Sequence, residues 1–291
     1  MARRSKLAKV AGLGLLGALT LSGCELTGSW VSWGWPEGIT DQAEAMHDLW
    51  IGSTIAALVV GIGVWLLIAY ATIRYRKRGD ELPRQTAYNL PLEVVYTIIP
   101  FLIIAVLFFF TVNTQNEVRD VSEDPDVTVA VNAFKWNWQF VYPETETESG
   151  EAVSTVGTST EIPILVVPTD RTIRFELASA DVIHSFWVPE FLFKLDIIPG
   201  QDNGRDNVFE VTVREEGAYV GRCAELCGTY HAFMNFELRS VTPDEYETYL
   251  EAREEGLSSY DALVLIGEPG EAVSTEPFLL QREQQAVASD D

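Results

Sequence analysis

The sequence predicts a membrane-anchored protein, with a two-helix transmembrane hairpin followed by an all-β domain of the Greek-key sandwich type. Two long uncharged segments in the first half of the chain predict the hairpin. Short segments rich in β-branched and aromatic residues, without helical patterns between them, predict the sandwich in the second half. With 291 residues, the chain is long enough for one or two domains with a substantial core.

The first 23 residues have the features of a targeting segment. A basic stretch, MARRSKLAK, precedes a short apolar stretch that ends in LSGC at Cys24. Small residues directly before a cysteine resemble the lipobox of bacterial lipoproteins, in which the cysteine is lipidated and becomes the new N-terminus. We therefore expect a lipoprotein signal peptide over 1–23, lipidation of Cys24 and an extracytoplasmic segment over 24–47. An ordinary signal peptide with a chance cysteine is the alternative.

Two uncharged segments predict the transmembrane hairpin, which we place at 48–116. The first covers 25 residues from 49 to 73, and the second covers 23 residues from 94 to 116. At about 1.5 Å per residue, each segment is long enough to cross a hydrocarbon core of roughly 30 Å. Segments this long and apolar argue against the alternative, a buried helical hairpin of a soluble protein.

Charges beside these segments predict the topology. The loop RYRKRGDELPR between them holds five basic residues, whereas the segment 25–48 holds five acids and no Lys or Arg. The positive-inside rule then places the loop in the cytoplasm and everything after about residue 117 outside. Lipidation of Cys24, which occurs on the outer face, predicts the same topology. We expect a multi-pass protein of a bacterial plasma membrane with its large domain on the extracytoplasmic side.

The segment 117–245 is predicted to form the sandwich. β-Branched and aromatic residues with partial alternation gather in three segments, DVTVAVNAFKWNWQFVY, PILVVPTDRTIRFEL and NVFEVTVREEGAYVGRC. The polar, acidic segment 143–161 is interpreted as an exposed loop inserted into this domain. The acidic C-terminal tail, 246–291, is expected to contribute to one helix, PDEYETYLEAREEG, and then to lack a fixed structure.

The extracytoplasmic part of the chain is strongly acidic. The whole chain has a net charge of −23, and residues 113–291 alone hold 35 acidic and 11 basic residues. This charge argues against nucleic-acid binding and would steer a basic protein partner toward the domain. Solubility or salt tolerance is the alternative explanation of the acidity.

The stretch CAELCGTYHAFM, from 223 to 234, gathers potential metal ligands. With Cys24 assigned to the lipid, Cys223 and Cys227 remain of the three cysteines. A disulfide between cysteines four residues apart would contribute little loop entropy, and a thioredoxin-type motif has two intervening residues rather than three. Zinc gains nothing from Met234, whereas thiolate, imidazole and thioether together suit copper.

Two thiolates indicate two metal ions bridged by shared sulfurs. His231 and Met234 would serve as terminal ligands, but a binuclear site needs a second histidine. His47 lies at the start of the first span, whereas His184, in SADVIHSFWVPE, follows a predicted strand on the same side of the membrane as the cysteines. We therefore expect His184 in the site, although on its own it would be interpreted as a packed core residue.

These motifs resemble subunit II of haem–copper cytochrome c oxidases of the aa3 type. The resemblance is carried by SADVIHSFWVPE, DIIPG and CAELCGTYHAFM behind a two-helix hairpin, and it covers about residues 45–245. It implies a cupredoxin domain with a dinuclear Cu(A) centre, an electron relay in which two coppers share one electron's charge. The side-chain ligands that it implies are His184, Cys223, Cys227, His231 and Met234.

The resemblance also implies roles for three further residues. Glu225 would bind one copper through its backbone carbonyl, and its carboxylate would face a Mg²⁺ or Mn²⁺ ion shared with subunit I. NAFKWNWQFVY resembles the segment where electrons arrive from cytochrome c, which implies this role for Trp136. LEVVYTIIP resembles the start of the family's second helix, which implies that Glu93 lies at the cytoplasmic mouth of a proton pathway. A simple interfacial carboxylate is the alternative for Glu93.

Alternation in KWNWQF puts Trp136 and Trp138 on one face of a strand. We expect Trp136 to reach the surface at the strand end and Trp138 to pack inward. Two core tryptophans are the alternative.

The function implied by the resemblance is electron transfer from a c-type cytochrome through Cu(A) to haem in the catalytic subunit, where O₂ is reduced to water with proton pumping. The implied partners are oxidase subunits I and III, a c-type cytochrome and membrane lipid. The insert 143–161 is interpreted as a mark of a specialised donor, for which a cytochrome attached to the membrane within a supercomplex is one candidate. Gln201 stands where an arginine is usual, so the role of a basic residue there is in doubt. A stand-alone membrane copper carrier or chaperone is the alternative function.

Overall fold

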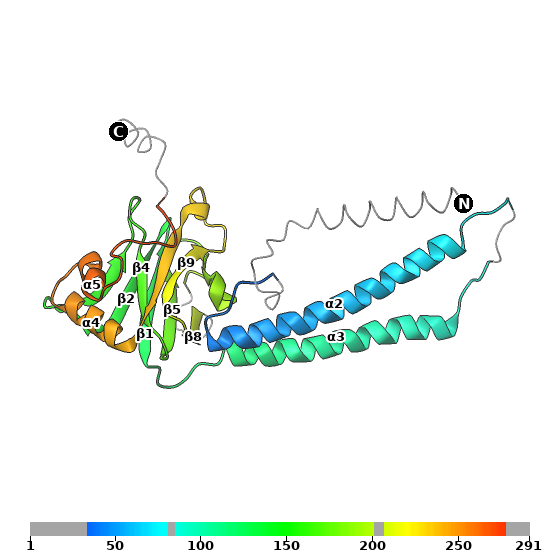
Figure 1. The fold of residues 1–291 in the computed structure, drawn as a ribbon, viewed down its shortest axis with the longest axis horizontal. Helices are drawn as coiled ribbons and strands as arrows, with labels where there is room; N and C mark the ends of the chain where they lie inside the picture. Colours follow the sequence, from blue (N-terminus) through cyan, green and yellow to red (C-terminus); the bar gives the residue numbers. More distant parts are fainter. Residues whose placement is uncertain (1–33, 81–84, 201–206, 278–291) are drawn as a thin grey trace, which may run out of the picture. The chain divides into compact units, whose positions relative to one another are not determined.

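The computed structural model describes residues 34–80, 85–200 and 207–277 (Figure 1). The predicted signal peptide, Cys24 and Gln201 lie outside the described residues.

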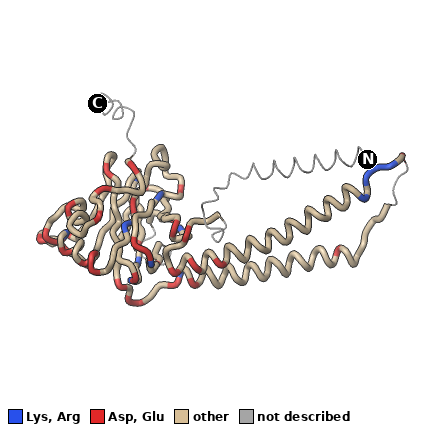
Figure 2. Tube along the Cα trace, viewed as in Figure 1, with Lys and Arg blue, Asp and Glu red and all other residues tan. Residues whose placement is uncertain are grey.

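Two long apolar helices form the hairpin. Helix α2 spans Asp41–Arg74 and helix α3 spans Leu90–Val118. Most of their large apolar side chains are exposed, as Trp65 and Phe101 are at 72% and 71%. Such surfaces are unfavourable in water and suit contact with lipid. Figure 2 shows that the basic residues of this region gather at the end of α2 and in the segment that connects it to α3, as the sequence indicated.

Both helices extend beyond the predicted uncharged segments because polar residues cap their N-termini. The Thr40 hydroxyl accepts a hydrogen bond from the backbone N–H of Ala43 at 3.0 Å. At the start of α3, the side chain of Asn89 accepts from the N–H of Leu92, and the Glu93 carboxylate accepts from the N–H of Asn89 at 3.0 Å. These reciprocal bonds satisfy backbone donors that the helix leaves unpaired.

The second half of the chain folds into a two-sheet sandwich, as predicted. Within the described residues, one sheet has the strand order β3-β2-β1-β5-β8 and the other has the order β4-β10-β9-β6-β7. The chain crosses between the sheets after β3, β4, β5, β7 and β8, which is typical of Greek-key sandwiches. The strands are β1 Val127–Phe134, β2 Asn137–Glu146, β3 Ala152–Val156, β4 Ile164–Pro168, β5 Thr172–Ser179, β6 His184–Val188, β7 Phe193–Ile197, β8 Val208–Thr212, β9 Gly217–Cys223 and β10 Asn235–Val241.

Aromatic side chains from both sheets fill the core between them. The ring of Trp138, on β2, lies edge-on to Phe186 of β6 and Phe236 of β10, with centroids 6.0 and 5.2 Å apart. Phe175 of β5 packs against Phe186 at 5.3 Å. These side chains are 0–1% exposed, and each contributes a large apolar area to the core. The core also contacts the metal-ligand loop described below, because Trp138 Nε1–H donates to the carbonyl of Met234.

Two segments differ from the prediction. The insert 143–161 is not simply a loop, because β2 continues to Glu146 and β3 covers Ala152–Val156. Its Val153 is 1% exposed, so the insert adds a strand to the sheet and a side chain to the core. The tail contains the predicted helix, α4 Pro243–Glu254, and also an unpredicted helix, α5 Ser259–Leu265. The structure describes the chain beyond α5 as far as Pro277.

Candidate metal centre

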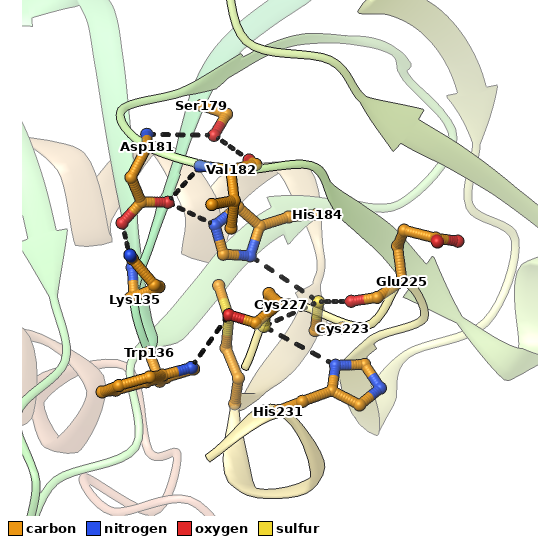
Figure 3. Close-up of polar contacts among 11 residues, drawn as sticks. Lys135, Trp136, Ser179, Asp181, Val182, His184, Cys223, Glu225, Cys227 and His231 are labelled. Atoms are coloured by element: carbon orange, nitrogen blue, oxygen red, sulfur yellow. Dashed lines mark hydrogen bonds and ion pairs between the residues drawn. The ribbon is translucent and has the colours of Figure 1, made fainter. Parts of the chain in front are cut away.

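Strands β6 and β9 and the loop after β9 bring the predicted ligands together (Figure 3). His184 opens β6 and Cys223 ends β9. The two strands pair antiparallel with Phe186 opposite Cys223, which sets the thiol beside the start of β6. The loop then carries Cys227 and the short 3-10 helix η3, His231–Phe233, before β10 begins at Asn235.

The sulfur and imidazole groups form one compact cluster. The two Sγ atoms lie 3.9 Å apart, which is too far for a disulfide bond of about 2.05 Å. Cys223 Sγ lies 3.8 Å from His184 Nδ1, and Cys227 Sγ lies 3.6 Å from His231 Nδ1. Met234 Sδ lies 3.9 Å from Cys227 Sγ. Each thiol therefore has its own imidazole, and the thioether lies on the Cys227 side.

This donor set fits copper. Thiolate, imidazole and thioether donors favour soft or borderline metals, whereas Mg²⁺ and Ca²⁺ require oxygen donors. His184 Nδ1 and the two Sγ atoms lie within 4.8 Å of one another, so one ion could contact all three. Two thiols and two imidazoles in this symmetrical arrangement also suit two bridged ions. His184, Cys223, Cys227 and Met234 are 0–7% exposed, so the protein shields the cluster from water.

Glu225 contributes its backbone to the cluster and not its side chain. Its carbonyl oxygen lies 3.2 Å from Cys223 Sγ. In Figure 3 the carboxylate of Glu225 points away from the thiols. This side chain is exposed. The carboxylate is therefore free to act outside the cluster.

The two thiols of the cluster differ in pKa. Burial alone would raise the pKa of the Cys223 thiol, but hydrogen bonds with His184 and with the backbone of Glu225 and Ser185 together lower it. Burial raises the pKa of the Cys227 thiol, and the neighbouring Cys223 charge raises it further. Burial alone would lower the pKa of His184, but hydrogen bonds with Cys223 and Asp181 raise it. One thiol thus ionises more readily than the other, because two adjacent thiolates repel each other.

Asp181 orients one of the imidazoles, and the sequence analysis missed it. Its Oδ1 lies 2.8 Å from His184 Nε2, which directs Nδ1 toward Cys223. Its Oδ2 accepts a hydrogen bond from the backbone N–H of Lys135 at 2.8 Å. A carboxylate on the far nitrogen of a histidine is a common support for metal ligands. Its position three residues before His184 in SADVIH was the available sequence signal.

Trp136 contacts the cluster loop, but from a turn and not from a strand. It lies between the end of β1 at Phe134 and the start of β2 at Asn137, so the expectation that it shares a strand face with Trp138 is wrong. Its Nε1–H donates to the carbonyl of Cys227 at 3.2 Å, and its ring lies edge-on to Tyr230 at 4.9 Å. The indole is half-buried and lines a surface pocket of about 400 Å³.

Trp138 is buried, as expected. It is 0% exposed, and its Nε1–H donates to the carbonyl of Met234 at 3.1 Å. The two indoles therefore bind carbonyls at two points of the cluster loop. Gly228 allows the close approach of Trp136: it has a φ of +123°, and a Cβ there would lie 3.2 Å from the indole ring.

The other two residues considered in the sequence analysis lie in the hairpin. Glu93 is in the first turn of α3, where its carboxylate caps the helix. His47 is in α2. Neither belongs to the group of potential ligands that the structure brings together among the described residues.

Two apolar helices, a two-sheet sandwich and a buried group of two thiols and imidazoles define a membrane-anchored protein with a candidate copper site. The chain belongs to the cytochrome c oxidase subunit II family: the model of the family's periplasmic domain matches residues 127–241, and the model of its transmembrane domain matches residues 28–113. The chain is therefore a subunit of an oxidase complex, anchored in a membrane by apolar helices.

Curated relatives match nearly the whole chain. A probable cytochrome c oxidase subunit 2 of Nocardia farcinica is 44% identical over an alignment that covers 99% of this chain and 92% of the relative. The cytochrome c oxidase subunit 2 of Mycobacterium bovis is 43% identical over an alignment that covers 97% of this chain and 91% of the relative. Among solved structures, the periplasmic domain of subunit II of cytochrome oxidase of Bradyrhizobium japonicum is similar at 28% identity and a TM-score of 0.39, covering 47% of this chain and 100% of that chain.

Proposed function

We propose that this chain is the electron-accepting subunit of its oxidase. It takes electrons from a c-type cytochrome and passes them to haem in the catalytic subunit, where O₂ is reduced to water with proton pumping. The observation that carries this proposal is the hydrogen bond from Trp136 Nε1 to the carbonyl of Cys227. It connects a half-buried indole at a surface pocket directly to a residue of the thiol cluster.

His184, Cys223, Cys227, His231 and Met234 would hold the metal, together with the carbonyl of Glu225. Bound there, a dinuclear copper centre would supply reversible one-electron transfer. Asp181 keeps the His184 ring in one orientation, and Trp138 fixes the loop at the Met234 carbonyl. Burial of the donors limits the rearrangement of water when the charge changes. An electron relay needs ligands that are held in place, because large movements of the ligands during each transfer would slow it.

The exposed surface beside the cluster is the proposed contact with subunit I. The exposed Glu225 carboxylate points away from the thiols, which suits a Mg²⁺ or Mn²⁺ ion shared with that subunit. Glu93, at the start of α3, would serve proton delivery from the cytoplasmic side. Subunit III, membrane lipid and a membrane-attached donor within a supercomplex complete the proposed assembly. The acidic domain in Figure 2 suits a basic donor.

Purification of the native complex through this chain tests the proposal. We expect the complex to contain haem, to hold two coppers in this chain in a mixed-valence state and to oxidise reduced cytochrome c with O₂. Recovery of this chain with copper but without haem or oxidase activity would instead support the alternative, a stand-alone copper carrier or chaperone.

A further inference from the structure

Residues 268–277, which follow α5, bind along strand β10, and we call this segment the C-terminal strap. Asn235, Glu237 and Arg239 lie two residues apart on β10, so their side chains leave the same face of the strand. Phe236 and Leu238 leave the opposite face and belong to the core. The face that carries the three polar side chains is the one that holds the strap.

A buried ion pair holds the strap in place. Glu237 and Arg239 form a salt bridge and are 0% and 1% exposed. Glu237 Oε2 accepts hydrogen bonds from the backbone N–H groups of Val273 and Ser274, both at 2.6 Å. Arg239 Nη1 donates to the Glu268 carboxylate at 2.9 Å and also bonds a carbonyl of the strap.

Such a pair is costly to bury unless its remaining donors and acceptors are satisfied. Here the strap satisfies the remaining groups. Residues of opposite charge at these two positions of β10 therefore specify where the strap runs, a role that two apolar residues could not perform.

The end of the strap reaches the pocket beside Trp136. The Asn235 side chain donates to the Thr275 hydroxyl at 3.3 Å, and Pro277 lines the same pocket as Trp136 and Tyr230. The strap sequence EPGEAVSTEP holds three glutamates and no Lys or Arg. Of these, Glu271 and Glu276 are exposed. The strap thus adds Pro277 to the wall of the pocket, and the exposed Glu276 directly precedes Pro277 in the chain.

We propose that the C-terminal strap is a docking element for the electron donor, a protein with basic side chains around an apolar contact surface. Pro277 contacts the apolar surface at the pocket, and Glu271 and Glu276 attract the basic side chains around it. The ion pair of Glu237 and Arg239 acts as a positioning device for the strap. This inference rests on the proposed function of Trp136, because the pocket matters only if electrons arrive there.

Charge variants of the whole oxidase complex test whether the strap glutamates attract the donor. A soluble basic cytochrome c serves as the donor. Combined Glu271→Gln and Glu276→Gln should raise the KM for this donor about threefold to tenfold at low salt. The effect should fade at high salt because ions screen exposed charges. The rate at saturating donor and the copper spectrum should not change. Glu251→Gln with Glu255→Gln on and after α4 removes the same charge from exposed positions outside the pocket lining and should leave KM unchanged.

Two truncations test whether the end of the strap at the pocket contributes to donor binding. A chain that ends after Ser274 keeps the hydrogen bonds to Glu237 but loses the part of the strap that reaches the pocket, whereas a chain that ends after Pro277 keeps both. Only the first should raise the KM for the donor, and it should do so at low and high salt. Equal KM values in the two truncations, or in the charge variants and their control, would overturn the inference.

The outcomes separate this inference from the proposed function. If electrons pass through Trp136 but the strap variants bind the donor normally, the strap is only structural and the proposed function stands. If the strap variants weaken donor binding while Trp136→Ala transfers electrons at the normal rate, the strap docks the donor and Trp136 has been assigned wrongly.

Discussion

Trp136 touches the metal-ligand loop and also lines a surface pocket, so its replacement separates electron transfer from folding. Trp136→Ala should slow electron transfer from cytochrome c to the copper by about tenfold or more, equivalent to at least about 1.4 kcal/mol of barrier. Its half-buried position predicts little change in copper content or donor affinity. Stopped-flow reduction of the copper by cytochrome c measures the rate.

Trp138 provides the contrast for that experiment. It is 0% exposed in the core, so Trp138→Ala should cost about 3–5 kcal/mol of unfolding free energy and disturb the copper loop through the lost bond to Met234. If Trp136→Ala behaves in this way too, losing copper or unfolding while the remaining enzyme accepts electrons normally, Trp136 is a core residue and not the electron acceptor.

The two cysteines and the methionine should differ in their effect on the copper. Cys223→Ser or Cys227→Ser should abolish the mixed-valence two-copper state, because each removes one of two sulfurs that lie 3.9 Å apart between the imidazoles. Met234→Leu should leave copper bound with a shifted potential, since the thioether is the weaker ligand. Elemental analysis and electron paramagnetic resonance distinguish these results. A single copper in the intact wild-type domain would contradict the dinuclear site.

At the scale of elements, the first turn of α3 holds Glu93, a residue with two candidate roles. The Glu93 carboxylate caps the helix by accepting the N–H of Asn89, and it is also the proposed group at the mouth of a proton pathway. Glu93→Gln keeps an oxygen that can accept this N–H but cannot titrate. We expect this substitution to slow turnover of the oxidase complex, with an unchanged copper spectrum and an unchanged thermal midpoint.

Asn89→Ala is the matched control for Glu93. It removes the side-chain cap on the N–H of Leu92 and leaves the carboxylate in place. It should cost about 1 kcal/mol of helix stability, without the turnover defect. If Glu93→Gln has normal turnover across the pH range, the carboxylate is only a helix cap at the membrane surface.

The elements that depend on local pattern could be predicted from the sequence. The hairpin follows from hydropathy, the sandwich strands from alternation, and α4 from its capping box of Thr242 and Glu245. Helix α5 escaped prediction because it has only seven residues, and its buried Ala262 and Leu263 acquire their role only by packing on the core. The position of Trp136 was misjudged because a two-residue turn interrupts the apparent alternation.

The site was predicted as far as the types and spacing of its residues allowed. Cys223, Cys227, His231 and Met234 lie within twelve residues of one another in the sequence, and His184 was added from the need for a second imidazole. The support from Asp181 and the strap contacts of Glu237 and Arg239 depend on distant backbone meeting in the fold. The bond from Ser274 to Glu237, for example, joins residues 37 positions apart. The alternation of residues along a strand or helix does not predict contacts between segments that lie far apart in the sequence.

At the scale of the whole molecule, basic and acidic residues are concentrated in different parts of the chain. Basic residues gather in the segment that connects the two apolar helices, whereas the sandwich carries most of the acids (Figure 2). The positive-inside rule predicts that the basic loop lies in the cytoplasm and the metal cluster on the outer side, where the proposed cytochrome donor would reach it. Lipidation of Cys24 would be possible only in this orientation, so the N-terminus tests the topology.

The mature chain should therefore begin at Cys24 and carry a lipid. A single acyl chain holds a protein on a membrane only weakly, with a binding constant of about 10⁴ M⁻¹, whereas two apolar helices hold it firmly. Cys24→Ser should consequently abolish the lipid but leave the chain in the membrane fraction with normal copper content. Mass spectrometry of the purified chain gives the N-terminal residue and its modification. An unmodified N-terminus upstream of Cys24 would contradict lipidation and leave an ordinary targeting segment or an uncleaved N-terminus.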